Sequence, residues 1–565
     1  MGVHVYRLFL LILVLAVSVT GILAGTEGKK KISAGAPLRI QIQPWGRSQK
    51  DVDTARSMAD KSPALRQVLD GSVYKFISVD FPDAQDGARD LSTEFRAVYY
   101  DYTNARVVIA EGDIAGSKSV DVSTAKFQPA VSTDELIAAF AAVESDTKLG
   151  PLYKTKQIDI SPAMPPFTVI GDSRIINLSM KTLDNFSVIG VDLKDGRVVN
   201  YEGGAPPMSK AAPEACGIQG SGQATTSNGT PGQALLTIFQ GVNKLWEMTV
   251  TRPSASSGNP TERSGIELQD VKYKSKLMLK RAHVPLLNVQ YSGDFCGPYR
   301  DWQWQEGSFV APDAGSTELV PGIRVLADGQ VATTALDTGN DTGNFRGVAI
   351  YKQTTENGEE IVLVSEMNAG WYRYIMEWRF APDGTVRPRY GFGGVDNACV
   401  CAVHFHHAYW RFDFDVVSSN NRVYQVEQGK KFLAPIRTEA KISRNYGTNR
   451  SILVQFGGGD EAVQVIPNLT DGVADQFGLG DFWILKYQNS GGFPLEIDDP
   501  NPPGDEIGYL DQWVNGESID NTDVVVWYAA HFTHNDGGNL LDPSRRPNVL
   551  TGSHVVGPDI RAIRW

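Results

Sequence analysis

Residues 399–416 have the sequence CVCAVHFHHAYWRFDFDV, which places two cysteines, three histidines and two aspartates within eighteen positions. Aromatic and aliphatic residues fill most of the other positions, as is typical of a β strand. Side chains two positions apart on a strand point to the same face, so His404 and His406 can bind one metal ion while His407 points away. The segment therefore predicts a strand that carries part of a metal site.

A similar strand-like pattern extends over residues 235–565. Short alternating segments rich in Val, Tyr, Trp and Phe recur between clusters of Gly, Asn and Asp, and no long amphipathic helix is evident. This pattern is typical of a large antiparallel β-sandwich. We therefore expect the histidine segment to be one strand of that sandwich.

Two shorter regions precede the sandwich, and each combines a helical segment with strands. In residues 45–130 the helical segment comes first, and in residues 131–210 the pattern recurs after Ser132, a residue type that suits a helix N-cap. A linker rich in Gly, Pro and Ser follows over residues 211–234. The expected fold class is α+β, with two small N-terminal α+β domains followed by a large antiparallel β-sandwich catalytic domain.

Length and composition agree with this division. A chain of 565 residues is too long for a single core, so several domains are expected. Hydrophobic and charged residues make up 42% and 21% of the chain, as in ordinary globular proteins. The formal charge of −12 argues against nucleic acid as a partner.

Residues 1–25 combine Arg7, an apolar run and small residues near Ala24, which predicts a secretory signal peptide. Residues 26–44 are expected to form a flexible segment. We expect a secreted, extracellular protein (periplasmic in a bacterium) with no stable membrane insertion after cleavage. An uncleaved membrane anchor is the alternative, because Lys29–Lys31 follow the apolar run closely.

Four cysteines are present, and an oxidising compartment would allow them to pair in any of three ways. They are Cys216, Cys296, Cys399 and Cys401.

The residues around the histidines argue against two common types of metal site. Cys399 and Cys401 have the opposite strand parity to His404 and His406, and the loop-and-helix spacing of a Cys₂His₂ zinc site is missing. A cupin-type iron site expects a Glu shortly after its histidine pair, and the chain has Ala, Tyr and Trp there. Neither of these sites is favoured.

A third imidazole is available in DVVVWYAAHFTHNDGG, which contains His531 and His534. Three neutral imidazoles with open coordination positions suit copper(II) or catalytic zinc. The alternative is a set of core or surface histidines without a metal.

Several segments together resemble the copper-containing, topaquinone-dependent amine oxidases. The resemblance rests on three segments. The first is HFHHAYWRFDFDV, with its Arg-x-Asp run at Arg411 and Asp413, and the second is the third-histidine segment DVVVWYAAHFTH. The third is GWYRYIMEW, in which Tyr372, Tyr374 and Trp378 match the cofactor motif. The resemblance selects His534 over His531.

The resemblance implies the cofactors. Copper(II) would be held by His404, His406 and His534, and Tyr372 would be the precursor of topaquinone. The two small α+β domains would correspond to the family's N2-like and N3-like domains, and the chain would form a homodimer.

The resemblance also implies the reaction. The enzyme would oxidise a primary amine with O₂, releasing an aldehyde, ammonia and hydrogen peroxide, with the quinone as electron sink. Tyr291 would hydrogen-bond the quinone, and Asp301 would be the catalytic base, with its pKa raised by burial. The plainer alternatives are a turn aspartate paired with Arg300 and tyrosines that only pack in the sandwich.

A second cation site is implied at the end of the histidine strand. Its ligands would be Asp413, the carbonyl of Phe414, Asp415 and Asp523, and oxygen ligands of this number suit calcium in a structural role. The alternative is a charge-alternating, solvated strand.

The chain departs from the family pattern beside Tyr372. Trp371 and Arg373 stand where the family has Asn and an acidic residue. If the segment is a strand throughout, both side chains point away from the face that carries Tyr372. Two further hypotheses remain: a copper-binding, amine-oxidase-like protein without the quinone, acting in binding or structure, and a hydrolytic zinc enzyme with three histidines.

Overall fold

The structure is a computed structural model. It describes residues 36–82, 91–182, 186–199, 217–220, 232–256, 264–291, 299–356, 358–395, 398–401, 403–427, 432–469, 471–472, 474, 480–490, 493–496, 509–534 and 555–565. The expected signal peptide and most of the linker lie outside these ranges. None of the helices in the described part is long and apolar enough to cross a membrane.

The first small unit has two helices packed on a four-stranded sheet. Its elements are α1 (Gln49–Lys61), α2 (Pro63–Leu69), β2 (Tyr74–Asp80), β3 (Glu94–Asp101), β4 (Arg106–Asp113) and β5 (Asp121–Ala125). The sequence indicated one helical segment, and the structure divides it at Ser62. The Ser62 side chain accepts a hydrogen bond from the Leu65 backbone N–H, and Pro63 follows as the first residue of α2, a position that tolerates proline.

The second small unit repeats the arrangement. Its elements are α3 (Thr133–Ser145), α4 (Leu149–Lys154), β6 (Asp159–Ile170), β7 (Ser173–Lys181), β8 (Phe186–Asp192) and β9 (Arg197–Val199). As predicted, Ser132 caps α3, and it forms a capping box with Glu135. Apolar residues of both sheets pack against α3, and the Glu135 carboxylate accepts hydrogen bonds from Arg174 of β7 and from Tyr102 after β3. The two α+β units therefore share one core.

The rest of the described chain is built mainly from two large sheets. We call the first the histidine sheet: β1 (Leu38–Pro44), β11 (Gln233–Gln240), β12 (Asn243–Thr251), β13 (Glu267–Tyr273), β14 (Lys276–Tyr291), β23 (His404–Phe414), β32 (Val524–His534), β29 (Phe482–Lys486) and β26 (Ala440–Ile442), with β15 (Tyr299–Arg300) on β14.

We call the second the tyrosine sheet: β16 (Thr317–Val320), β17 (Ile323–Val325), β19 (Val348–Thr355), β20 (Gly358–Ala369), β21 (Tyr372–Phe380), β22 (Thr385–Gly394), β34 (Asp559–Ile563), β28 (Ala462–Ile466), β27 (Arg450–Phe456), β24 (Asn421–Glu427) and β25 (Phe432–Ile436), with β33 (Val555–Val556) on β22. Short elements complete the described chain: β10 (Gln219–Gly220), β18 (Asn340–Asp341), β30 (Asn489–Ser490), β31 (Phe493–Pro494), α5 (Ala335–Thr338), η1 (Pro253–Ala255), η2 (Ala398–Cys401) and η4 (Tyr509–Trp513).

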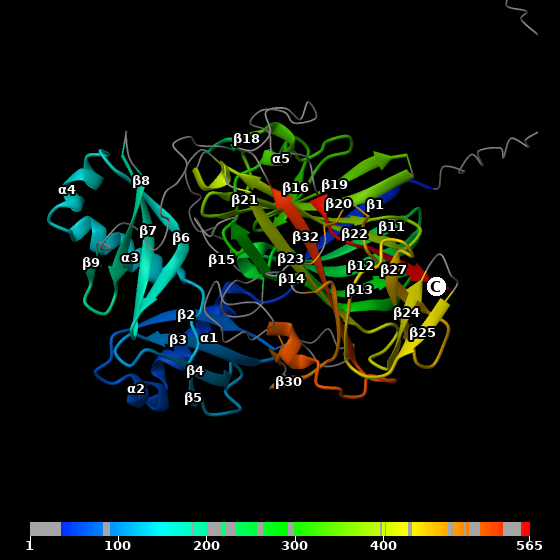
Figure 1. Cartoon of the computed structure of the whole chain (residues 1–565), viewed down its shortest axis with the longest axis horizontal. Helices are drawn as coiled ribbons and strands as arrows, with labels where there is room; N and C mark the ends of the chain where they lie inside the picture. The colour runs from blue at the N-terminus through cyan, green and yellow to red at the C-terminus, as the bar shows by residue number, and fades with distance from the viewer. Residues whose placement is uncertain are drawn as a thin grey trace, which may run out of the picture. The chain divides into compact units, whose positions relative to one another are not determined.

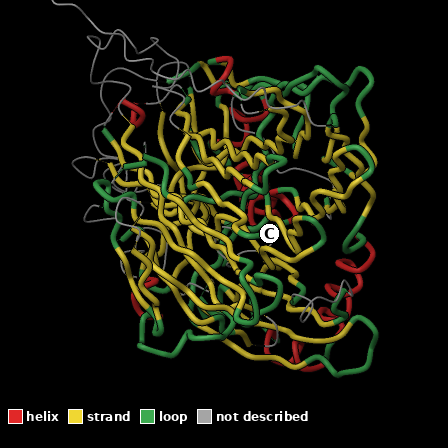
Figure 2. Tube along the Cα trace, turned by 90° about the vertical axis from the view of Figure 1, so that its right-hand side faces the viewer, coloured by secondary structure: helices red, strands yellow, loops and turns green. Residues whose placement is uncertain are grey.

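Strands dominate the described chain, as Figure 2 shows, and one apolar core fills the space between the two large sheets. In the described part, the pairings within these sheets are antiparallel except for β17 with β19. The strands β14, β23 and β32 lie side by side (Figure 1). The chain thus has the predicted α+β class, with two small α+β units followed by an antiparallel β-sandwich.

One expectation was wrong. Leu38–Pro44 falls in the segment expected to be flexible, and it forms β1, which pairs with β11 at the edge of the histidine sheet. The physical reason is a period-2 pattern, because Leu38, Ile40 and Ile42 alternate with polar residues and Leu38 and Ile42 are buried. Alternation over seven residues was a sufficient signal for a strand.

The buried carboxyl group of Asp471 gives the fold a predicted pH dependence. It accepts hydrogen bonds from the Tyr528 hydroxyl and the Gly557 backbone N–H, but burial dominates and raises its pKa to about 6, from 3.8. A folded-state pKa above the unfolded value means that the folded state binds more protons between these values. Stability therefore falls as the pH rises from about 4 to about 6, by about 3 kcal/mol in all, and is constant above.

Asp471→Asn should remove this slope, because the amide does not ionise and can still bond both partners. The measurement is the free energy of unfolding in denaturant at pH 4, 5, 6 and 7. We expect the variant and the unaltered chain to diverge steadily between pH 4 and 6, with the variant more stable at pH 7. Parallel pH profiles would show that Asp471 ionises normally.

Candidate metal centre

Three adjacent strands present the site residues in one row. His404 on β23 lies opposite Tyr291 on β14 and opposite His534 on β32. Directly opposed residues of an antiparallel pair point to the same face of the sheet. His404, Tyr291 and His534 therefore project together, and His406, two positions along β23, projects with them.

The same parity separates the two candidates for the third histidine. His531 lies opposite His407 and three positions before His534, so His407 and His531 point to the other face. There His407 Nδ1 lies 2.8 Å from His531 Nδ1, and His531 Nε2 lies 3.1 Å from the Gly480 carbonyl oxygen. The structure groups His534, rather than His531, with His404 and His406.

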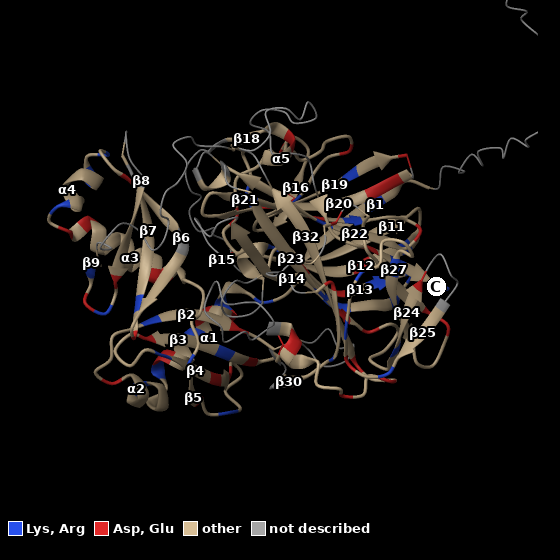
Figure 3. Cartoon of the chain, in the orientation of Figure 1, with Lys and Arg blue, Asp and Glu red and all other residues tan. Residues whose placement is uncertain are grey.

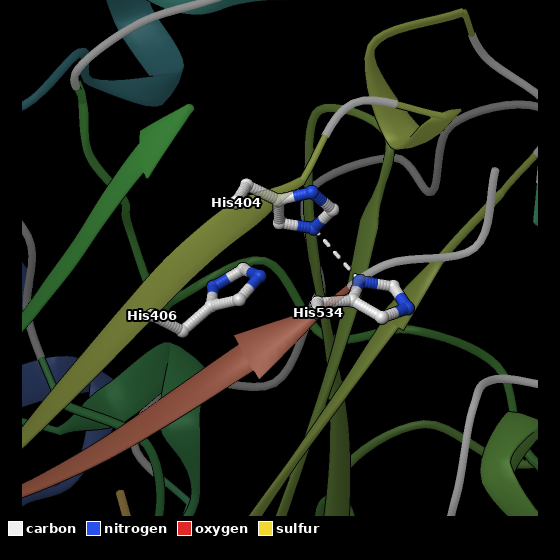
Figure 4. A group of neighbouring side chains, drawn as sticks. All are labelled: His404, His406 and His534. Atoms are coloured by element: carbon white, nitrogen blue, oxygen red, sulfur yellow. Dashed lines mark hydrogen bonds between the residues drawn. The ribbon is translucent and has the colours of Figure 1, made fainter. Parts of the chain in front are cut away.

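Nitrogen atoms of the three grouped imidazoles lie within 4.8 Å of one another. His404 Nε2 lies 2.7 Å from His534 Nδ1, and Figure 4 shows the His406 ring beside this pair. Nitrogens bound to one metal ion at about 2 Å lie about 3 Å from each other. His404 and His534 are therefore spaced as two ligands of one ion would be.

His406 gives the strongest indication of a ligand. Its side chain is fully buried, and neither ring nitrogen has a hydrogen-bond partner among the described residues. Burial, together with His404 and His534 nearby, holds the pKa of His406 well below its usual range, so the ring is neutral at pH 7. Buried polar groups are nearly always bonded, and neutral imidazole is the form that binds metal ions. His406 fits the site as a metal ligand.

The strand that carries His534 has no charged side chains. β32 contains no Lys, Arg, Asp or Glu and is tan along its length in Figure 3. Cys399, which a Cys₂His₂ site would need as a thiolate, is disulfide-bonded. Cys216 and Cys296 and the side chain of Cys401 lie outside the described residues. Among the described residues, the donors grouped here are three imidazoles.

Tyr372 reaches the triad from the opposite sheet. It is the first residue of β21 and is fully buried, and its ring centroid lies 4.9 Å from that of His406 and 5.5 Å from that of His404. Its phenol oxygen contacts the phenol oxygen of Tyr291. The structure thus brings together the three histidines and both tyrosines that the sequence motifs selected.

The expected orientation of Trp371 was wrong. Trp371 does not belong to a strand: Gly370 and Trp371 form the two-residue turn between β20 and β21, with Ala369 paired to Tyr372. The turn directs the indole toward the site, where Nε1 donates a hydrogen bond of 2.9 Å to the Tyr291 hydroxyl. The signal for this hairpin was Gly370 at the first turn position, where its φ of +55° suits glycine.

Arg373 lies within β21, one position from Tyr372, and therefore has the opposite parity, as expected. Its side chain is fully buried, and Nη1 donates a hydrogen bond of 2.9 Å to the Tyr372 carbonyl oxygen. The guanidinium thus supports the backbone of the site from the face away from the phenol.

Asp301 lies directly after β15 and is fully buried. Its carboxylate accepts a hydrogen bond from the Tyr374 hydroxyl, and the Tyr374 ring stacks on that of Tyr372 at 5.5 Å between centroids. Burial raises the pKa of Tyr374 well above its usual range, and the charge of Asp301 adds to the effect, so Tyr374 remains a donor. The carboxylate is therefore placed beside Tyr372 through one intervening ring. The side chain of Arg300, the alternative partner, lies outside the described residues.

The three aspartates of the predicted calcium site also come together. Carboxylate oxygens of Asp413, Asp415 and Asp523 lie within 4.8 Å of one another, close to the end of β23. The Phe414 carbonyl oxygen, expected as a further ligand, accepts a hydrogen bond of 3.1 Å from Asn421 Nδ2. Asp413 also contacts Arg411, whose Nη1 lies 3.4 Å from it. Three carboxylates beside one cation leave net negative charge, which fits a hard cation such as calcium.

Comparison with known proteins gives the fold and no more. Neither a protein family model nor a curated protein sequence matches the chain. In structure it is similar to a copper-containing benzylamine oxidase from Hansenula polymorpha, with a TM-score of 0.55 and 14% identity over 90% of this chain and 96% of that one. Pichia pastoris lysyl oxidase gives a TM-score of 0.54 and 11% identity over 92% of this chain and 89% of that one. Aspergillus nidulans amine oxidase gives 0.53 and 11% over 94% and 90%.

Proposed function

We propose that this chain is a secreted, copper- and topaquinone-dependent primary-amine oxidase. The reaction converts a primary amine, O₂ and water to an aldehyde, ammonia and hydrogen peroxide. The observation that carries the proposal is the Tyr372 ring, which comes from one sheet and lies 4.9 Å between centroids from His406 of the triad on the other sheet. The fold shared with a copper-containing benzylamine oxidase, a lysyl oxidase and an amine oxidase supports it.

Copper(II) would be held by His404, His406 and His534. Three buried imidazoles suit copper(II), and His406 has two ring nitrogens without another partner in the described part. With copper and O₂, Tyr372 would be converted to topaquinone, which supplies an electron sink for oxidation of the amine.

The chain's own groups would handle the proton and the orientation of the substrate. Asp301 would accept the proton from the carbon that bears the amine nitrogen, because its buried carboxylate is hydrogen-bonded to Tyr374, whose ring stacks on that of Tyr372. Tyr374 would hold Asp301 in place, and Tyr291 would hold the oxygen of residue 372.

The remaining features belong to the same proposal. Calcium bound by Asp413, Asp415 and Asp523 would tie the end of β23 to the residue before β32. Secretion, cleavage of residues 1–25, a homodimer and the domain division at 45–130, 131–210 and 235–565 remain predictions from the sequence.

A second candidate is a copper-binding protein of the same fold without the quinone. It is favoured by one observation, the bulky Trp371 indole that bonds the Tyr291 hydroxyl beside Tyr372. Conversion of Tyr372 to the quinone adds oxygen to its ring, which needs free space beside the ring. The two candidate functions differ only in whether the quinone forms.

The test is reconstitution of metal-free protein with copper(II) in air, followed by phenylhydrazine and peptide mapping. We expect one copper per chain and a covalent adduct on the peptide that contains Tyr372. Tyr372→Phe is the matched control, and it should bind copper equally and take up no label, since it lacks only the phenol oxygen. Copper binding without an adduct would establish the second candidate, and a preference for zinc with no peroxide from any amine would favour a hydrolytic enzyme.

A further inference from the structure

Trp371 is placed by a tight turn, not by the strand that follows. Gly370 and Trp371 alone connect β20 to β21, and glycine at the first position with positive φ is typical of a type II′ hairpin. Trp371 is 4% exposed, and its backbone carbonyl accepts a hydrogen bond of 2.8 Å from the Val395 N–H. Both the backbone and the ring are therefore fixed next to Tyr372.

The indole N–H has a defined hydrogen-bond role. Nε1 lies 2.9 Å from the Tyr291 hydroxyl oxygen, and the ring centroids of the two residues are 6.5 Å apart. An indole nitrogen only donates, so the Tyr291 oxygen is the acceptor and keeps its own proton and one lone pair for Tyr372. Tyr291 and Tyr372 are both buried, at 1% and 0% exposure, so water does not compete for these bonds.

We infer that Trp371 is a positioning residue that holds the Tyr291 phenol against residue 372. This rests on the proposed function in so far as residue 372 is the reacting group. Without the indole donor, the Tyr291 hydroxyl would keep its contact with the Tyr372 hydroxyl but lose the bond that fixes its oxygen from the side of the turn. With the donor in place, the Tyr291 oxygen is held between the indole N–H and the hydroxyl oxygen of residue 372. Donation from the indole also makes the Tyr291 phenol a stronger donor.

The role belongs to this chain's own sequence. The family pattern has Asn before the cofactor tyrosine, and here a larger ring, carried on a turn, reaches a phenol on the opposite sheet. The same indole that could obstruct the site would instead order it.

The first test needs no metal. Melting temperatures are measured for metal-free Trp371→Phe, Tyr291→Phe and the double variant. Phe keeps an aromatic ring at 371 and removes the N–H. If the bond exists, the loss in Tm of the double variant is smaller than the sum of the two single losses, because each single change already breaks the bond. Trp246→Phe is the matched control: its buried N–H donates to the Ala381 carbonyl oxygen at 3.0 Å, so its loss should add to that of Tyr291→Phe.

The second test follows phenylhydrazine labelling of residue 372 after loading with copper in air. Trp371→Phe should bind copper normally and react about two- to tenfold more slowly, as expected for loss of one hydrogen bond, while Trp246→Phe reacts at the normal rate. Additive Tm losses would overturn the inference, and so would an unchanged labelling rate alongside non-additive losses. If the unaltered chain takes no label, the amine-oxidase proposal fails, and the Tm comparison alone decides whether Trp371 holds Tyr291.

Discussion

Replacing His406 with Leu is expected to abolish copper binding and yet to leave the metal-free protein at least as stable as the unaltered chain. His406 is fully buried with both ring nitrogens lacking partners in the described structure, an arrangement that costs about 1 to 3 kcal/mol. Leu has a similar volume and no polar atoms, so the change removes this penalty and keeps contact with Phe392 and Tyr372. We expect the metal-free variant to be about 1 kcal/mol more stable.

Copper should reverse the order. An ion that binds only the folded state stabilises it by about 4 kcal/mol when present at about a thousand times its Kd. The unaltered chain should gain this stability and His406→Leu should gain none. Thermal unfolding with and without copper(II), together with metal analysis, provides both measurements.

His407→Leu is the matched control, one position away on the opposite face. His407 bonds His531, so its loss should destabilise the metal-free protein by about 1 to 3 kcal/mol, while copper binding remains. If His406→Leu destabilised the metal-free protein as much as His407→Leu, His406 would be a packing residue, and its assignment as a metal ligand would be wrong.

The sequence predicted this site well because strand parity is a local property. The spacing of His404 and His406 places both on one face whatever the rest of the fold, and the odd spacing of His531 and His534 allows only one of them to join. The antiparallel register that sets His404 opposite His534 depends on residues far apart in the chain, and only the resemblance between motifs anticipated it.

Trp371 shows where sequence reasoning failed. A strand running through Trp371 would point its side chain away from the site, but the chain turns there, so the side chain enters the site. The available signal was a glycine between two apolar runs, and hairpin geometry depends on which strands pair, which a local pattern does not reveal. The difference concerns one residue, but it changes Trp371 from a side chain outside the site to a hydrogen-bond donor within it.

The two-sheet construction explains why these groups have the properties described. The histidines stand on one sheet and Tyr372 and Tyr374 on the other, so the site lies in the core between them and water is excluded. Exclusion of water keeps the His406 imidazole neutral and keeps Tyr374 protonated as a donor to Asp301. The site's chemistry is thus a consequence of its place in the sandwich.

Asp301→Asn should lower the rate of amine oxidation by about a hundred- to ten-thousandfold, the usual contribution of a general base. The amide oxygen can still accept the Tyr374 hydrogen bond, so the change removes basicity with little change of shape. Copper content and phenylhydrazine labelling of residue 372 should be normal, since neither needs the carboxylate as a base. Peroxide release during turnover of a primary amine measures the rate.

Tyr374→Phe separates the base from its support. This variant keeps the Asp301 carboxylate and removes the hydroxyl that donates a hydrogen bond to it. The rate should therefore fall only about two- to tenfold, the effect of one hydrogen bond. The step assigned to Asp301 removes a hydrogen from the carbon that bears the nitrogen. A substrate with deuterium at that carbon should therefore be oxidised more slowly, and the kinetic isotope effect of Asp301→Asn should be at least as large as that of the unaltered enzyme. An Asp301→Asn variant that retained more than about a tenth of the rate, where a base contributes at least a hundredfold, would show that another group takes the proton.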